Sequence, residues 1–127
     1  MLYKDEVLYK MVAPYADARV AAQVHRMMTR TPVQGAAAAL RGRALRPDYR
    51  DLLTRVGVPA LVVVGADDEF TPVHDAEVMH AALPDSTLRV IASAAHLPNL
   101  ERPEEFNAAL AAFLDRLGAP SPAHSER

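Results

Sequence analysis

The chain has 127 residues, of which 50% are hydrophobic and 24% are charged, and its formal net charge is −2. This length holds at most one domain, and the mixed charges exclude a basic surface for nucleic acid or membrane and an acidic tail. The sequence has no cysteine, which excludes disulfides and cysteine-ligated metal and is typical of a reducing compartment. No apolar run has the length of a signal peptide core or a membrane span, so we expect a cytoplasmic protein.

Two helices are predicted in the first third of the chain. In residues 16–30, Val20, Val24, Met27 and Met28 recur at helical spacing with polar residues between them. Thr31-Pro32 interrupts this helix, because proline disfavours helix in the residue before it, and residues 33–45 then form a second, alanine-rich pattern. The Met27-Met28 pair can line a pocket for an apolar substrate, because methionine adapts its shape, although ordinary packing is the simpler interpretation.

Helices and strands alternate in the rest of the chain. A continuous apolar run such as residues 60–64 is typical of a strand covered on both faces in a parallel sheet. In chain order, the predicted elements are a short helix capped by Asp48, a strand over 60–64, a helix over 73–83, a strand over 88–91 and a helix over 103–117. The tail after Gly118 is predicted to be disordered.

The predicted strands are too few for a complete sheet. Strands joined through a helix pair in parallel, but two parallel strands alone leave both edges open and have little surface to bury. We therefore expect the sheet to continue with strands from an upstream segment or from another chain.

An acidic residue and a histidine follow the two predicted strands. Asp67 and Asp68 come after Gly65, and His96 follows the second strand. Ligands of open parallel sheets lie outside the carboxyl ends of the strands, where these residues fall. His96 can take a proton from a nucleophile and return it to a leaving group, while a carboxylate fixes its tautomer. The pattern predicts two members of a catalytic triad, with Asp67 as the competitor of Asp68.

A nucleophile for this pair is missing from the sequence. In triads ordered serine, acid, histidine, the serine precedes the acid on a G-x-S-x-G turn, and no serine of this chain lies in that motif. Ser93 is three residues before His96 and has no glycine turn around it, so we do not favour it. Because the acid and the histidine are present without a nucleophile, we expect this chain to be the C-terminal half of an enzyme.

The remaining titratable residues do not predict a metal site. Glu69, His74, Asp75, His80 and Glu101 lack the H-x-x-x-H or H-E-x-x-H spacing, so we expect neither metal nor cofactor. They are better explained as solvated loop and helix residues. Glu101 is close to the His96 loop in sequence, and we expect it to hold the turn by hydrogen bonds, with contact to the substrate as the alternative.

Two loop motifs carry a family resemblance. Residues 65–72 read GADDEFTP and residues 94–106 read AAHLPNLERPEEF. They resemble the C-terminal part of α/β-hydrolase superfamily enzymes, and most closely the branch of 3-oxoadipate enol-lactone hydrolases and small carboxylesterases. The acid loop of that branch, G-x-x-D-x-x-T-P, aligned on Gly65, assigns the acid to Asp68.

This resemblance implies a fold and its divisions. The fold is α/β, the C-terminal portion of an α/β-hydrolase, with the last two parallel strands and their flanking helices in residues 48–117. Residues 1–47 correspond to part of the helical cap, and residues 118–127 to a disordered tail. In such a cap, Met27 and Met28 would line the substrate pocket.

Two functions are implied. The first is the C-terminal fragment of a serine hydrolase of carboxylic esters or lactones, inactive alone and completed by an N-terminal half or within a homo-oligomer. The second is a non-catalytic, truncated module that pairs with another chain through its sheet edge. Dehalogenases and C–C bond hydrolases use the same acid and histidine, so the substrate remains open. Neither function involves nucleic acid or a membrane.

Overall fold

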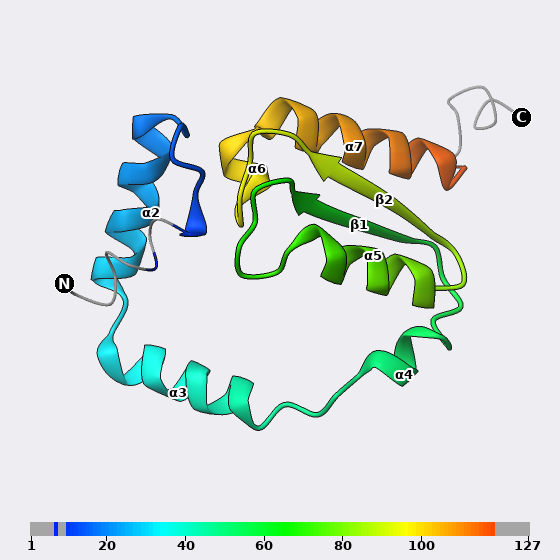
Figure 1. Ribbon diagram of the computed structural model, residues 1–127, viewed down its shortest axis with the longest axis horizontal. Coiled ribbons are helices and arrows are strands. Elements are labelled where there is room, and N and C mark those ends of the chain that lie inside the picture. Colours follow the sequence, from blue (N-terminus) through cyan, green and yellow to red (C-terminus); the bar gives the residue numbers. More distant parts are fainter. Residues whose placement is uncertain (1–6, 8–9, 119–127) are drawn as a thin grey trace, which may run out of the picture.

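The computed structural model describes Val7 and residues 10–118 (Figure 1). In chain order its elements are α2 (Ala18–Arg30), α3 (Val33–Ala44), α4 (Arg50–Leu53), β1 (Ala60–Gly65), α5 (Val73–Ala82), β2 (Ser86–Ile91), α6 (Pro98–Glu101) and α7 (Pro103–Arg116). Every helix and strand predicted from the sequence is confirmed, and α6 is an addition. The predicted disorder concerns a tail that, after Gly118, lies outside the described residues.

The sheet has two parallel strands. β1 pairs with β2 from Ala60 opposite Ser86 to Gly65 opposite Ile91, and α5 makes the connection between them. Figure 1 shows α5 on one side of the strands and α7 on the other. Helices thus flank both faces of the sheet, as the apolar run in β1 predicts. We call residues 60–116, from β1 to α7, the strand unit.

The core of the strand unit is small and aliphatic. Val62 and Val64 of β1 are buried against Ala76 of α5. The half-buried side chains of Val73, Leu83 and Leu88 pack around this cluster. The side chains of Val62 and Val64 share one face of β1, because side chains two residues apart in a strand point the same way.

Local signals explain where the longer helices begin and end. The Asp17 side chain accepts a hydrogen bond of 2.7 Å from the Arg19 N–H and caps α2, which ends at Thr31-Pro32 as predicted. The helix α7 begins at Pro103, has acidic residues in its first turn and ends on Arg116, in accord with the helix dipole.

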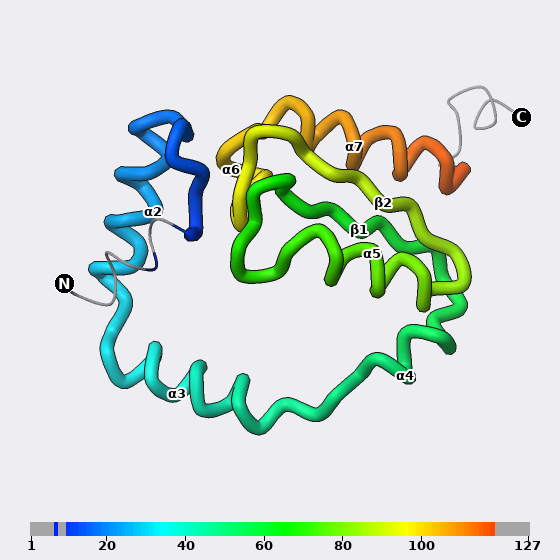
Figure 2. Tube along the Cα trace, viewed as in Figure 1, coloured from blue at the N-terminus to red at the C-terminus, as the bar shows by residue number. Residues whose placement is uncertain are grey.

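The helices α2, α3 and α4 form a second region, which we call the helical arm (residues 18–53). Figure 2 shows its trace arching away from the two strands before it returns to them at β1. Val24 is the buried residue of α2, whereas α3 has none. Val33 is 84% exposed, and Leu45, which follows α3, is 83% exposed. The arm therefore carries apolar side chains that no described part of the chain covers.

Among the described residues, no helix is both long enough and apolar enough to cross a bilayer.

Candidate active site

The loops that follow β1 and β2 are in direct contact at Gly65. A Cβ atom built on Gly65 would lie 2.0 Å from the Ala95 carbonyl oxygen and 2.4 Å from that of Ala94. No side chain fits in this space, so glycine is required for the loops to approach. The Asp67 N–H donates a 2.9 Å hydrogen bond to the Ala94 carbonyl. This contact holds the loop that bears Asp68 beside the loop that bears His96.

Asp68 is buried, with 8% of its surface exposed, and both of its carboxylate oxygens accept hydrogen bonds. Oδ1 accepts from the backbone N–H groups of Phe70 and Thr71, at 2.9 and 3.0 Å. Oδ2 accepts from the Thr71 hydroxyl at 3.0 Å and lies 3.0 Å from His96 Nδ1. The turn that follows Asp68 therefore fixes this carboxylate before any ligand arrives.

Two opposing effects act on the pKa of Asp68. Burial raises it, because the charged carboxylate loses water. The hydrogen bonds from Thr71 and the neighbouring His96 lower it, and together they outweigh burial, so the pKa lies below its ordinary value. Asp68 is therefore ionised near neutral pH and can hold a proton on the nitrogen that faces it.

The His96 ring has two contacts, and the backbone of this residue has a third. Its Nδ1 faces Asp68, its ring packs edge-on against Phe70 with 5.2 Å between centroids, and its backbone N–H donates to the Met11 carbonyl at 3.1 Å. Because a carboxylate accepts at Nδ1, we assign the proton of the neutral ring to that atom. Nε2 then keeps its lone pair. The side chain is 33% exposed, so a reacting group can reach it.

The neighbouring carboxylate is engaged elsewhere. Asp67 is exposed, and its Oδ2 accepts a hydrogen bond from the Tyr15 hydroxyl. Asp68, and not Asp67, is therefore the carboxylate that contacts His96. This placement favours Asp68 of the two residues that the sequence left open as the acid, and its catalytic role remains a prediction.

Glu101 holds the backbone around His96. The side chain is buried, with 7% of the residue exposed. Its carboxylate accepts hydrogen bonds from the Ala95 and Leu97 N–H groups, which flank His96, at 3.0 and 3.1 Å. It also accepts from the Ala13 N–H. The expectation that Glu101 holds this turn is confirmed, whereas the expectation that it is solvated is wrong, because its carboxylate is buried among backbone N–H donors. The contact with Ala13 adds a link that the sequence did not reveal.

A cavity of about 470 Å³ opens beside His96. It is lined by Val7, Met11, Arg43, Arg46, Phe70, Thr71 and His96. Sequence reasoning missed the two arginines and Met11, since no local pattern links them to His96. Met27 and Met28, the predicted lining residues, are not among these side chains; Met27 is 57% exposed and Met28 half-buried. Their role in substrate binding remains a prediction.

Ser93 is exposed, adopts a left-handed φ of 58°, and its carbonyl accepts a 3.0 Å hydrogen bond from Arg102 Nε. Within the described part of the chain, its hydroxyl makes no hydrogen bond to His96. In the same residues, no group of three or more histidine, aspartate or glutamate side chains is arranged to hold a metal ion.

Comparisons with known proteins agree with this geometry. Residues 2–109 match the alpha/beta hydrolase family. The chain is 34% identical over 92 residues to 3-oxoadipate enol-lactonase 1 of Acinetobacter baylyi, covering 72% of this chain and 34% of that protein. It is 40% identical over 72 residues to a pimeloyl-[acyl-carrier protein] methyl ester esterase of Neisseria meningitidis, covering 57% of this chain and 28% of the relative.

A solved structure of an esterase is also similar to this chain. A thermophilic esterase from Thermogutta terrifontis, solved with malate bound, superposes with a TM-score of 0.85 at 33% identity, covering 89% of this chain and 43% of that one. The chain thus spans about a third of the length of the curated relatives it matches. The predicted fold class and resemblance are confirmed, and the two-stranded parallel sheet with flanking helices is consistent with a C-terminal portion of the fold.

Proposed function

The chain belongs to the alpha/beta hydrolase family, and we propose that Asp68 and His96 are the acid and the base of a triad that hydrolyses carboxylic esters or lactones. One observation carries this proposal: His96 Nδ1 lies 3.0 Å from a buried carboxylate that is already hydrogen-bonded on both oxygens. Such an arrangement orients an imidazole and stabilises its protonated form during reaction. The relatives named as lactonase and methyl ester esterase support the substrate class.

The proposed chemistry uses the two nitrogens of His96 differently. Nε2 accepts the proton of a serine hydroxyl as that oxygen attacks the carbonyl carbon of the ester or lactone. The protonated ring then gives this proton to the leaving oxygen as the C–O bond breaks. Water repeats the cycle and releases the acid. Asp68 stays ionised throughout and stabilises the positive ring.

The serine of this triad must come from outside residues 1–127, because no serine of the sequence lies in a G-x-S-x-G turn. We propose that a segment carrying this turn, the oxyanion donors and further strands completes the site. It is either an N-terminal half of the same hydrolase or a separate chain. Consistent with this, β1 pairs only with β2 in the part of the chain that the structure describes, so its other edge has no neighbouring strand there.

Reconstitution tests the proposal. The 127-residue chain would be co-expressed with the part of the Acinetobacter baylyi enol-lactonase that it does not match, and hydrolysis of p-nitrophenyl acetate and γ-butyrolactone would be followed. We expect activity only in the combination. The variant His96→Ala should lower kcat by about a thousandfold or more, because the general base is lost.

A second exposed histidine provides the matched control. His74 lies on α5 and is exposed, and His74→Ala should leave kcat unchanged. Equal losses in the two variants, or turnover that survives His96→Ala, would contradict the assignment of His96 as base. A combined preparation that turns over neither ester nor lactone would contradict the substrate class.

The second candidate is a non-catalytic module that pairs through the sheet edge. The exposed edge of the sheet favours it, as does Val90 of β2, a large apolar side chain that is 46% exposed. It predicts a stable assembly, detectable by size-exclusion chromatography, that has no esterase activity and is unchanged by His96→Ala. For either function we propose a cytoplasmic location, in keeping with the absence of cysteine.

A further inference from the structure

Among the described residues, the cavity beside His96 is lined by two arginines and by no acidic side chain. Arg43, at the end of α3, and Arg46, in the following loop, contribute to its wall together with His96. The remaining lining residues are apolar side chains and Thr71. Because a wall of one sign of charge attracts the opposite charge, this cavity favours an anion.

Neither arginine has a carboxylate partner in the described part of the chain. Asp48 is close to both in sequence, but its carboxylate is held by Arg50, with a closest distance of 2.6 Å and a second contact of 2.9 Å. That pairing lowers the pKa of Asp48 to about 2. The other carboxylate near the cavity, Asp68, is buried and engaged with Thr71 and His96. Among the described residues, no carboxylate pairs with either guanidinium group, so both can contact a ligand in the cavity.

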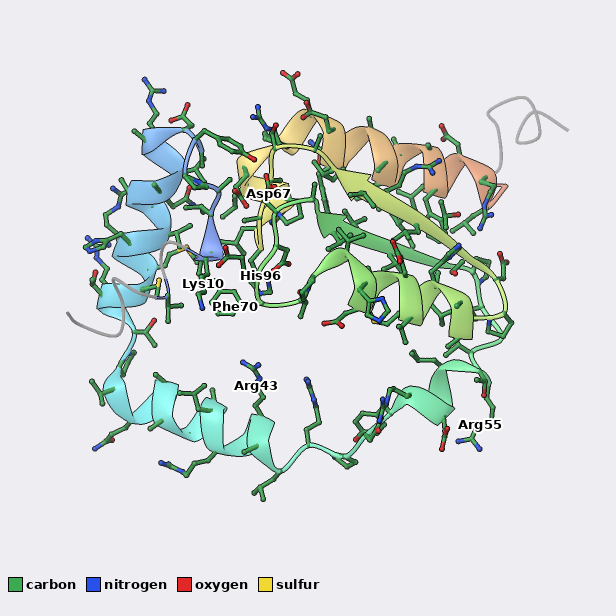
Figure 3. All side chains as sticks on the ribbon, in the orientation of Figure 1. Lys10, Arg43, Arg55, Asp67, Phe70 and His96 are labelled. Carbon is green, nitrogen blue, oxygen red and sulfur yellow. The ribbon has the colours of Figure 1, made fainter. Side chains whose placement is uncertain are left out.

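Figure 3 shows how these groups face one another. The Arg43 side chain extends from α3 toward the side on which Phe70 and His96 lie, and the exposed Lys10 lies beside them. Arg55, by contrast, lies just beyond α4, away from His96, and lines none of this cavity. The preference of cations for a helix C-terminus accounts for a basic residue at Arg43, but not for Arg46, which follows the helix.

We propose that Arg43 and Arg46 are specificity residues that bind a carboxylate on the substrate, so that the site prefers esters or lactones carrying a second, ionised carboxyl group. Guanidinium groups suit this task, because their planar donors match both oxygens of a carboxylate. The apolar side chains of Phe70 and Met11 are placed to contact the hydrocarbon between that carboxylate and the reacting carbonyl. This inference rests on the proposed function for the reaction, but the binding step is independent of it.

Binding is measured first, on the 127-residue chain. Monomethyl succinate, which is an anion at pH 7, and dimethyl succinate, which is its neutral counterpart, would be titrated while NMR follows the His96 ring and the arginine side chains. We expect the anion to bind about tenfold more tightly at low salt, and added salt to reduce this preference. Equal affinity for the two compounds would overturn the proposal.

Charge variants assign the effect to these two residues. The double variant Arg43→Gln with Arg46→Gln should abolish the preference for the anion, and the matched control Arg55→Gln should retain it. Replacing both arginines by lysine should keep part of the preference, since the charge remains but the paired donors are lost. A preference that survives the double glutamine variant, or that Arg55→Gln removes equally, would overturn the proposal.

Turnover by the reconstituted enzyme separates this inference from the proposed function. The ratio of kcat/KM for monomethyl over dimethyl succinate should fall about tenfold in the double glutamine variant and should stay the same in the matched control Arg55→Gln. An unchanged ratio in an active enzyme would overturn the inference and leave the proposed function intact. Selective binding without turnover of either ester would support the arginine site and count against the proposed reaction alone.

Discussion

The strand unit and the helical arm have similar apolar content but differ in how they are held. In the strand unit, Val64 is 5% exposed, and the loops beyond the strands are fixed by hydrogen bonds to Asp68 and Glu101. In the arm, α3 buries no residue, and Leu40 is 50% exposed. The strand unit therefore fixes Asp68 and His96, the proposed catalytic pair. The arm carries Arg43, which is proposed to determine substrate specificity. The proposed catalytic residues thus lie in the tightly packed part of the chain, and a proposed specificity residue lies in the more exposed part.

The largest expected effect is at Gly65, where the two loops of the strand unit meet. Gly65→Ala places a methyl group within 2.0 Å of a carbonyl oxygen, so the loops must separate. We expect the free energy of unfolding to fall by about 3 kcal/mol, as measured by urea denaturation. Gly57→Ala is the control, since nothing lies within 4 Å of that site. Similar losses in both variants would contradict this account of the loop contact.

Glu101 ties the strand unit to the segment that enters the arm. Glu101→Gln keeps the shape but replaces one acceptor oxygen by a donor, which leaves at least one of three buried N–H groups without a partner. We expect a loss of about 2 kcal/mol and faster hydrogen exchange at Ala13 and Leu97. The exposed Glu105 on α7 is the matched control. Unchanged exchange at Ala13 would show that Glu101 does not hold the two regions together.

A matched pair of valines compares the two regions directly. Val64→Ala removes buried methyl groups from the strand unit and should cost about 2 kcal/mol in unfolding free energy. Val33→Ala removes the same atoms from a side chain that is 84% exposed in the arm and should change stability by less than about 0.5 kcal/mol. If Val33→Ala proved as costly as Val64→Ala, the arm would have a packing partner in solution.

The smallest expected effect is a pH dependence that belongs to the strand unit alone. The folded pKa of Asp68 is lowered, so the unfolded chain takes up its proton first as the pH falls. The stability contributed by this carboxylate is therefore complete above the unfolded pKa of about 4 and is lost as the pH falls through the folded pKa. Unfolding free energies measured between pH 6 and pH 2 should decline less steeply in Asp68→Asn. Parallel profiles would contradict this contribution.

Much of the strand unit could be predicted from the sequence, because its signals are local. The apolar run of β1 and the spacing of Asp68 after Gly65 both lie within a few residues. The helix α6 was missed because its four residues are too short to show a helical period. The contact between Glu101 and Ala13 joins residues 88 positions apart, and the cavity brings Arg43 and Arg46 to His96. Such contacts depend on the tertiary arrangement of distant segments, which the spacing of apolar residues does not predict.

Met27 and Met28 illustrate the same limit. Their spacing predicted one face of a helix correctly, since α2 includes both. Spacing alone does not say what that face meets, and in the structure Met11, from an earlier segment, lines the cavity instead.

The His96 N–H donates to the Met11 carbonyl and the Ala13 N–H donates to the Glu101 carboxylate, so the segment before the helical arm is tied to the strand unit. The arm is therefore a closed loop, because its other end leads through residues 54–59 into β1. The entropy cost of closing a loop rises slowly with length, by only about 0.6 kcal/mol for each doubling. Residues inserted at Thr31-Pro32, between α2 and α3, would thus lengthen the arm without displacing Asp68 or His96. The helical arm, which carries the proposed specificity residue Arg43, can therefore vary in length while the contact between Asp68 and His96 stays fixed.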